Sequence, residues 1–252
     1  MIGSRTLGTG PQRVLVLNDW TFDTTSWDPA LPFLDLDAFT WVFADLRGYG
    51  RSRGQAGDCT LDEAAGDVLE LVDALDWDAF RVVGHSMSTL VALHLAQTAP
   101  DRIERLVLIT PPPPTGFGVP PEVQAGIEAL GRADDAGRLG ALRARSDGRL
   151  GDAWLRYKVA RWGAVADREA VGRYVALFAR DGLQSTDPVT APVRVLTGEA
   201  DSPGMRADDA RGFLADLCPD LHVHGLADVG HHPMIEMPPM TAHLVMGFLR
   251  SD

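Results

Sequence analysis

Residues 82–89 read V-V-G-H-S-M-S-T, and the interpretation of the whole chain depends on this stretch. The two valines end a short apolar run typical of a buried strand, and a helical pattern begins at Met87. Between them, Gly84-His85-Ser86 can form the sharp strand-to-helix turn that raises a serine oxygen above a sheet. A lone serine before a helix is more often an N-cap. The residues that the rest of the chain brings near Ser86 therefore decide between a nucleophile and a cap.

Short apolar runs recur along the chain, with helical patterns between them. They are near-continuous rather than alternating, as expected for strands buried on both faces of a parallel sheet. The runs lie at Arg13–Leu17, Thr40–Phe43, Phe80–Val83, Arg105–Ile109 and Pro192–Leu196, with a weaker one at Leu221–His224. Helices are predicted after the capping box Thr60–Glu63, at Met87–Gln97 and at Pro239–Leu249. This alternation predicts a three-layer α/β domain with right-handed crossovers.

The alternation stops after the proline run Pro111–Pro114. From about Pro120 to Asp181 the chain has helical patterns and no strand pattern. An insertion at this point would lie over the carboxyl ends of the strands, where open α/β sheets bind ligands. We therefore expect residues 1–114 and 186–252 to form the core and residues 115–185 to form a helical cap. Extra helices packed on one side of the sheet are the alternative.

The composition indicates a globular protein that handles small molecules. The 252 residues carry a formal charge of −12 and no Lys/Arg cluster, which argues against nucleic-acid binding. Cys59 and Cys218 are far apart in the sequence and form no C-x-x-C motif, so we expect free thiols. The first residues lack the apolar core of a signal peptide, and no run approaches membrane-spanning length. We expect a cytoplasmic protein, and the sequence does not predict its oligomeric state.

Ser86 requires a base and an orienting acid to act as a nucleophile. Asp201 follows the strand at 192–196, and His231 follows a glycine just ahead of the last predicted helix. Both positions are loops after strand ends, and the order Ser, Asp, His fits a catalytic triad. Asp228 lies too near His231 in sequence to approach its ring from the adjoining strand. Two weaker candidates for the acid are Glu199 and Asp187.

Four motifs in this order resemble the α/β-hydrolase superfamily, from about residue 8 to residue 250. They are the triad order, D-L-R-G-Y-G-R-S at 45–52, G-H-S-M at 84–87 and G-H-H-P-M-I-E-M-P at 230–238. The resemblance implies a mostly parallel sheet with a helical cap, and a Ser86–His231–Asp201 triad that needs no cofactor. It also implies that the backbone N–H groups of Trp20 and Met87 form an oxyanion hole.

The chain departs from the family pattern at two places. Where the family elbow has glycine, this chain has Ser88, and the next position is Thr89, so the start of the helix is expected to be slightly crowded. At the oxyanion loop, Asn18-Asp19-Trp20 replaces a His-Gly pair and the residue after it. Asn and Asp tolerate unusual backbone angles. The Asp19 carboxylate is expected to disfavour an anionic substrate or a developing oxyanion.

Several residues are candidates for the pocket wall because of where they occur in the sequence. They are Asp19, Phe117, Trp154, Tyr157, Trp162 and His232. Aromatic residues of a helical cap more often form its own core. His222 and His224, with the pair at 231–232, raise the possibility of a metal cluster, but acidic partners at ligand spacing are missing from this run. We therefore predict no metal site.

The function predicted from these features is hydrolysis of a small ester or lactone through an acyl-enzyme intermediate. Within the same superfamily, the alternatives are carbon–carbon bond hydrolysis, acyl transfer and cofactor-independent oxygenation of a ring compound. The departures at 18–20 and 88–89 favour a specialised member of this kind. A ligand receptor that keeps the pocket without turnover is an alternative from another class. The sequence does not identify the substrate, because fold does not fix function.

Overall fold

A seven-stranded sheet lies at the centre of the computed structural model, which describes residues 1–146 and 148–250. The strand order is β1-β3-β2-β4-β5-β6-β7, in which β1 pairs antiparallel with β3 and every other pair is parallel. The strands are β1 (Ser4–Leu7), β2 (Gln12–Leu17), β3 (Phe39–Ala44), β4 (Phe80–His85), β5 (Ile103–Ile109), β6 (Val193–Gly198) and β7 (Leu221–Leu226). This confirms the predicted α/β fold with a mostly parallel sheet. The edge strand β1 had no signal in the apolar pattern.

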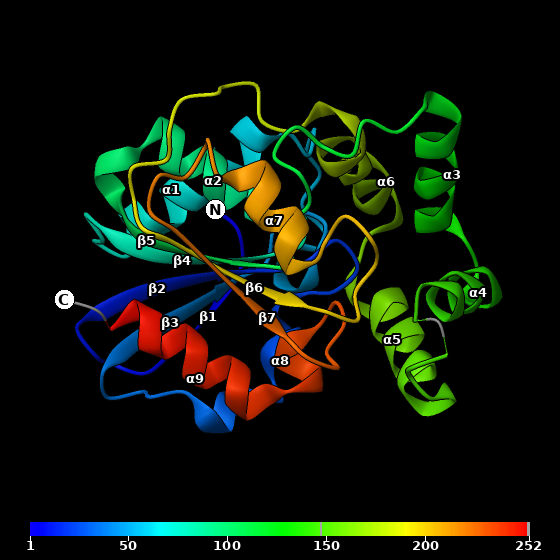
Figure 1. The fold of residues 1–252 in the computed structure, drawn as a ribbon, viewed down its shortest axis with the longest axis horizontal. Helices are drawn as coiled ribbons and strands as arrows, with labels where there is room; N and C mark the ends of the chain where they lie inside the picture. Colours follow the sequence, from blue (N-terminus) through cyan, green and yellow to red (C-terminus); the bar gives the residue numbers. More distant parts are fainter. Residues whose placement is uncertain (147, 251–252) are drawn as a thin grey trace.

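The central strands are buried on both faces, which explains their continuous apolar sequences. In β2, for example, Val14 and Val16 belong to one apolar cluster, and Leu15 and Leu17 belong to the other. Helices α1 (Leu61–Ala74), α2 (Ser88–Thr98) and α7 (Ala207–Leu214) contribute to the second cluster. Helix α9 (Pro238–Leu249) covers the opposite face (Figure 1).

The start of α1 shows how the local sequence sets an element boundary. The Thr60 side chain accepts a hydrogen bond from the Glu63 N–H, as a capping box requires. The Glu63 carboxylate accepts from the Cys59 N–H, one residue earlier than in the standard box. Cys59 has a φ of 59°, so the chain turns sharply into the helix at this point.

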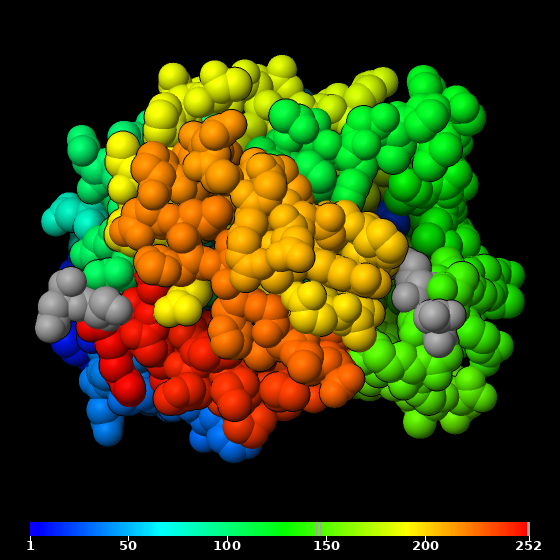
Figure 2. Space-filling model, in the orientation of Figure 1, coloured from blue at the N-terminus to red at the C-terminus, as the bar shows by residue number. Residues whose placement is uncertain are grey.

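Four helices lie between β5 and β6 in the sequence and project beyond one end of the sheet (Figure 1). They are α3 (Pro121–Arg132), α4 (Asp135–Ser146), α5 (Asp152–Val165) and α6 (Arg168–Ala176), followed by a π turn, η5 (Leu177–Asp181). This is the predicted helical insertion. In Figure 2 a hollow separates the green surface of these helices from the yellow and orange surface of the segments after β6.

The short α-helix α8 (Pro233–Glu236) is one turn directly before α9, and four 3-10 helices of three or four residues lie in the loops, η1 (Thr24–Trp27), η2 (Leu31–Phe33), η3 (Gly50–Ser52) and η4 (Pro100–Arg102). Among the described residues, no helix combines the length and the apolar character needed to cross a membrane.

Candidate active site

Ser86 occupies the turn between β4 and α2. Its φ is 54°, a left-handed conformation that is uncommon for a residue with a side chain. The Ser86 N–H donates to the Ile109 carbonyl of β5 at 2.8 Å, so the strained turn is held by the neighbouring strand. Helix α2 begins two residues later, and the positive end of its dipole therefore lies at this turn.

Gly84, Ser88 and Thr89 fit together tightly at the start of α2. A Cβ atom on Gly84 would lie 2.8 Å from the Ser88 carbonyl oxygen, so this position requires glycine. The Ser88 hydroxyl accepts from the His85 N–H at 2.9 Å, and the Thr89 hydroxyl donates to the Ser86 carbonyl at 2.6 Å. The two residues that replace the family glycines thus hydrogen-bond to the backbone of the turn.

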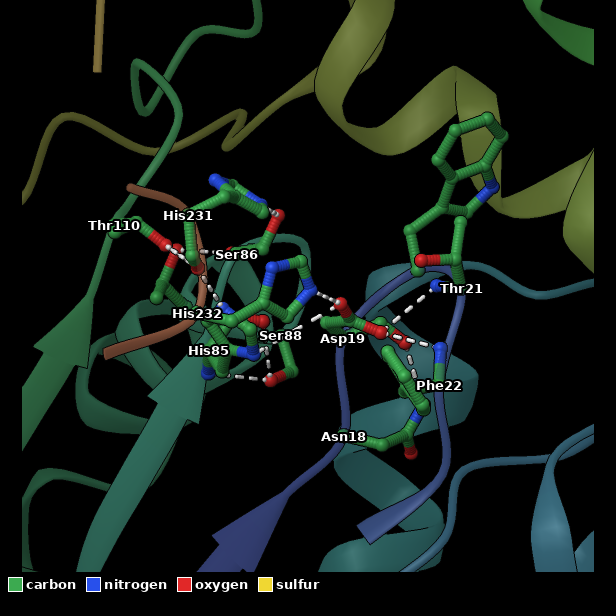
Figure 3. Close-up of polar contacts among 12 residues, drawn as sticks. Asn18, Asp19, Thr21, Phe22, His85, Ser86, Ser88, Thr110, His231 and His232 are labelled. Atoms are coloured by element: carbon green, nitrogen blue, oxygen red, sulfur yellow. Dashed lines mark hydrogen bonds and ion pairs between the residues drawn. The ribbon is translucent and has the colours of Figure 1, made fainter. Parts of the chain in front are cut away.

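His231 joins Ser86 to Asp201. The His231 Nε2 atom lies 2.9 Å from the Ser86 hydroxyl oxygen, and its Nδ1 lies 2.7 Å from Asp201 Oδ2 (the Ser86 contact is drawn in Figure 3). The other Asp201 oxygen accepts from the Ser202 N–H at 2.7 Å, which fixes the orientation of the buried carboxylate. The loops after β4, β6 and β7 therefore bring the three predicted residues together in one hydrogen-bonded chain.

The other acids considered from the sequence lie elsewhere. Asp228 is exposed at a left-handed turn with a φ of 59°. A Glu199 oxygen lies 3.3 Å from both the Thr197 hydroxyl and the Ala207 N–H, and Asp187 accepts from the Ser185 hydroxyl. The geometry thus places Asp201 beside His231.

Trp20 is anchored at both its backbone and its ring. Its carbonyl accepts from the Tyr49 hydroxyl at 2.8 Å, and its ring N–H donates to the Val171 carbonyl of α6 at 2.8 Å. The Asn18 amide accepts from the Leu46 N–H at 2.8 Å and so holds the start of the same loop. Within the described residues, the backbone N–H groups of Trp20 and Met87 have no hydrogen-bond acceptor. Trp20 lines the cavity next to Ser86, whereas Met87 is fully buried and is not among the residues that line it.

The two oxygens of Asp19 have different partners. Oδ1 accepts from the backbone N–H groups of Thr21 and Phe22, and this fixes the loop after β2. Oδ2 lies 3.1 Å from His232 Nε2 and 3.5 Å from the Lys158 Nζ atom (Figure 3 shows the His232 contact). Although burial raises the pKa of the Asp19 carboxyl, the Lys158 ammonium holds it well below its usual value.

Lys158 is the main residue at this site that the sequence analysis missed. It projects from α5 and is only 1% exposed, with its Nζ atom 2.8 Å from His232 Nε2 and 3.6 Å from the centre of the Phe22 ring. His232 Nε2 thus lies within hydrogen-bond distance of both the Lys158 ammonium and Asp19 Oδ2, and this one ring atom either accepts from the ammonium or donates to the carboxylate. The spacing Trp154, Lys158, Trp162 contained a usable signal, because it places a lysine on the aromatic face of a helix.

His85 and His232 are both buried beside this ion pair. Burial lowers the pKa of His85 to about 4 and, together with the Lys158 charge, lowers the pKa of His232 well below its usual value. His85 Nε2 lies 2.7 Å from the His231 carbonyl, to which it must donate. His85 therefore tethers the loop that carries His231.

A cavity of about 340 Å³ lies between the inserted helices and the strand ends, and all three residues of the hydrogen-bonded chain line it. Five of the six pocket candidates also line it: Asp19, Phe117, Trp154, Trp162 and His232. Tyr157 does not, because it is 44% exposed and its ring packs 6.2 Å from that of Phe22. Further apolar lining comes from Ile127, Leu130, Leu142, Leu150 and Phe178.

The histidines that suggested a metal cluster do not come together. His222 and His224 are exposed on β7, away from the pair at 231–232 in the pocket wall. Among the described residues, one group of donor atoms is close enough to share an ion, namely those of Asp19, His85 and His232 within 4.8 Å. The Lys158 ammonium already lies against two of these residues.

Comparison of the chain with known proteins finds a family match and a similar protein of about the same length. A family model described as alpha/beta hydrolase fold matches residues 17–238. The chain is 29% identical over 250 residues to the pimeloyl-acyl-carrier-protein methyl ester esterase of Sodalis glossinidius, covering 93% of this chain and 92% of that protein.

Two shorter matches concern other chemistries. The chain is 36% identical over 115 residues to the dihydrolipoyllysine-residue acetyltransferase component of the acetoin cleaving system of Cupriavidus necator, covering 44% of this chain and only 29% of that protein. It is 34% identical over 112 residues to the 2-heptyl-3-hydroxy-4(1H)-quinolone dioxygenase of Mycobacteroides abscessus, covering 42% of this chain and 41% of that protein.

Proposed function

The chain belongs to the α/β-hydrolase fold family, and from this premise we propose that it is a serine hydrolase that cleaves a small apolar ester or lactone. The observation that carries the proposal is the hydrogen-bonded chain from Ser86 through His231 to Asp201, with contacts of 2.9 and 2.7 Å. An activated serine needs a base within hydrogen-bond reach and an acid that orients the base, and these contacts meet both conditions.

The reaction follows from the atoms in contact. His231 Nε2 accepts the proton of the Ser86 hydroxyl while Oγ attacks the substrate carbonyl carbon. Asp201 holds the His231 Nδ1–H and stabilises the cationic ring. The protonated ring then donates to the leaving alkoxide, and the acyl group remains on Ser86. A water molecule deprotonated by His231 releases the acid and restores the serine.

The backbone N–H groups of Trp20 and Met87 would stabilise the negative charge that develops on the carbonyl oxygen. Loss of one such donor typically costs about 10²–10³ in rate. Met87 lies at the amino end of α2, whose dipole adds positive potential at the same place. The hydrogen bonds that anchor Trp20 keep its own N–H in a fixed position.

The cavity wall supports an apolar substrate. Leu130 and Ile127 from α3, Leu142 from α4 and Trp162 from α5 face the same space as Ser86. Burying an apolar acyl chain there contributes about 0.8 kcal/mol per methylene group. The similarity to a methyl ester esterase over most of the chain agrees with this substrate class.

The test is turnover of a panel of uncharged esters and lactones of increasing acyl length. We expect hydrolysis by the wild type that rises with acyl length until the cavity is filled, and its loss in the Ser86→Ala variant. Ser202→Ala is the matched control, because Ser202 lines the same cavity and its hydroxyl has no part in the proposed reaction. Equal activity of the Ser86→Ala variant and the wild type would refute the proposal.

A second candidate function has one observation in its favour, the similarity of 112 residues to a quinolone dioxygenase. In such a reaction the His231–Asp201 pair would remove a proton from a hydroxyl of a ring substrate, and Ser86 would only bind. Oxygen uptake with a hydroxylated quinolone that persists in the Ser86→Ala variant would favour this candidate. Ester turnover that depends on Ser86, without oxygen uptake, would exclude it.

A further inference from the structure

Asp19 places a negative charge next to the proposed oxyanion hole. It directly precedes Trp20, whose N–H is one of the two proposed donors. The carboxylate is 2% exposed, so water does little to screen its charge. The Asp19 carboxylate would repel the negative charge that develops on the carbonyl oxygen of the substrate. The site therefore needs a positive charge that compensates Asp19 before the reaction begins.

The groups around Asp19 Oδ2 identify that charge. Within hydrogen-bond or ion-pair distance of this oxygen, the described residues supply three nitrogen atoms, those of Lys158, His232 and His85, at 3.5, 3.1 and 3.9 Å. Of the three groups, Lys158 lowers the pKa of the Asp19 carboxyl most, ahead of both histidines, so the compensating charge comes from the ammonium group 3.5 Å away. The Phe22 ring face 3.6 Å from Nζ stabilises it further.

We propose that Lys158 is a positioning residue of the reaction, which neutralises Asp19 and so allows the N–H of Trp20 to hold the oxyanion. The inference rests on the proposed hydrolase function. Because Lys158 belongs to α5, the inserted helices supply a charge as well as an apolar wall. Asp19 in turn fixes the oxyanion loop through Oδ1.

Two variants of α5 test this role. Lys158→Met removes the cation and keeps an unbranched apolar chain. Arg156→Met removes an exposed cation from the same helix and is the matched control. We expect Lys158→Met to lower kcat by about 10- to 100-fold with a small change in KM, which is less than the full loss of a donor. Arg156→Met should leave both constants at the wild-type value.

A double variant separates charge compensation from packing. In Asp19→Asn/Lys158→Met, the asparagine oxygen can still accept from the Thr21 and Phe22 N–H groups, while the charged pair is gone. We expect its kcat to exceed that of Lys158→Met at least tenfold. A double variant that is as inactive or as unfolded as the single one would overturn the proposal, as would a Lys158→Met variant equal to Arg156→Met.

The titration of His232, followed by NMR, gives a readout that does not require turnover. The groups that face this ring are Asp19, Lys158, His85 and His231, with Trp154 packed edge-on. Without the ammonium, Asp19 is left to attract a proton, so the pKa of His232 should rise in Lys158→Met and stay low in Arg156→Met. An unchanged His232 pKa in Lys158→Met refutes the role of Lys158. A wild type that hydrolyses no ester refutes the proposed function instead.

Discussion

Asp201→Asn tests whether the buried carboxylate sets the tautomer of His231. Asp201 Oδ1 accepts from the Ser202 N–H at 2.7 Å, so an asparagine would keep its oxygen there and turn its NH₂ group toward His231 Nδ1, in place of the Oδ2 atom 2.7 Å away. His231 Nδ1 would then accept a hydrogen bond, and the ring proton would move to Nε2, which faces Ser86. A protonated Nε2 cannot accept the serine proton.

The expected loss of kcat is about 10⁴-fold, the effect of the same change in another Ser-His-Asp triad. It corresponds to about 5 kcal/mol of transition-state stabilisation. Because asparagine has the same shape, the melting temperature should change little. The assay is ester hydrolysis at pH 8, with circular dichroism as the check of folding. Asp228→Asn is the control, since Asp228 is exposed and asparagine tolerates its φ of 59°. A loss smaller than tenfold in Asp201→Asn, or an equal loss in Asp228→Asn, would refute the assignment.

Three further outcomes follow from the structure. The folded-state pKa of His85, about 4, lies below the ordinary value of 6.5, so its contribution to stability is complete above pH 6.5 and is lost as the pH falls toward 4. The loss in the free energy of unfolding amounts to about 3 kcal/mol. In His85→Gln, which keeps a donor for the His231 carbonyl, denaturant titrations should show an unfolding free energy that depends less on pH. Gly84→Ala should lower the free energy of unfolding by about 1–3 kcal/mol, because its Cβ would lie 2.8 Å from the Ser88 carbonyl oxygen. Gly66→Ala in α1, where the added Cβ meets open space, should raise it by about 0.5–1 kcal/mol. Leu130→Trp should reduce turnover of long acyl chains more than that of acetyl esters, and equal losses would contradict the proposed acyl site.

The sequence predicted the central strands well because they are buried on both faces and so have continuous apolar runs. The edge strand β1 was missed because Leu7 is its one apolar residue and the strand is not buried. The partners of Ser86 could be predicted because each follows a strand end, and the carboxyl ends of parallel strands meet at one edge of the sheet.

The environment of Asp19 could not be predicted in the same way. From the sequence, its carboxylate was expected to disfavour an anionic substrate or a developing oxyanion. Lys158 comes from a helix 139 positions later, and only the packing of α5 over the strand ends brings the two side chains together. Tyr157 shows the same limit. Neighbouring residues of a helix point in different directions, so Lys158 lines the cavity while Tyr157, one position earlier in α5, is exposed.

The central claim is that Ser86 is an activated nucleophile. The most direct measurement is mass spectrometry of the protein after treatment with a fluorophosphonate, with the modified peptide sequenced. The geometry predicts one phosphonyl group per chain, attached to Ser86, and much slower labelling in His231→Ala. Active protein that carries no adduct, or an adduct on another residue with Ser86 unmodified, would contradict the account.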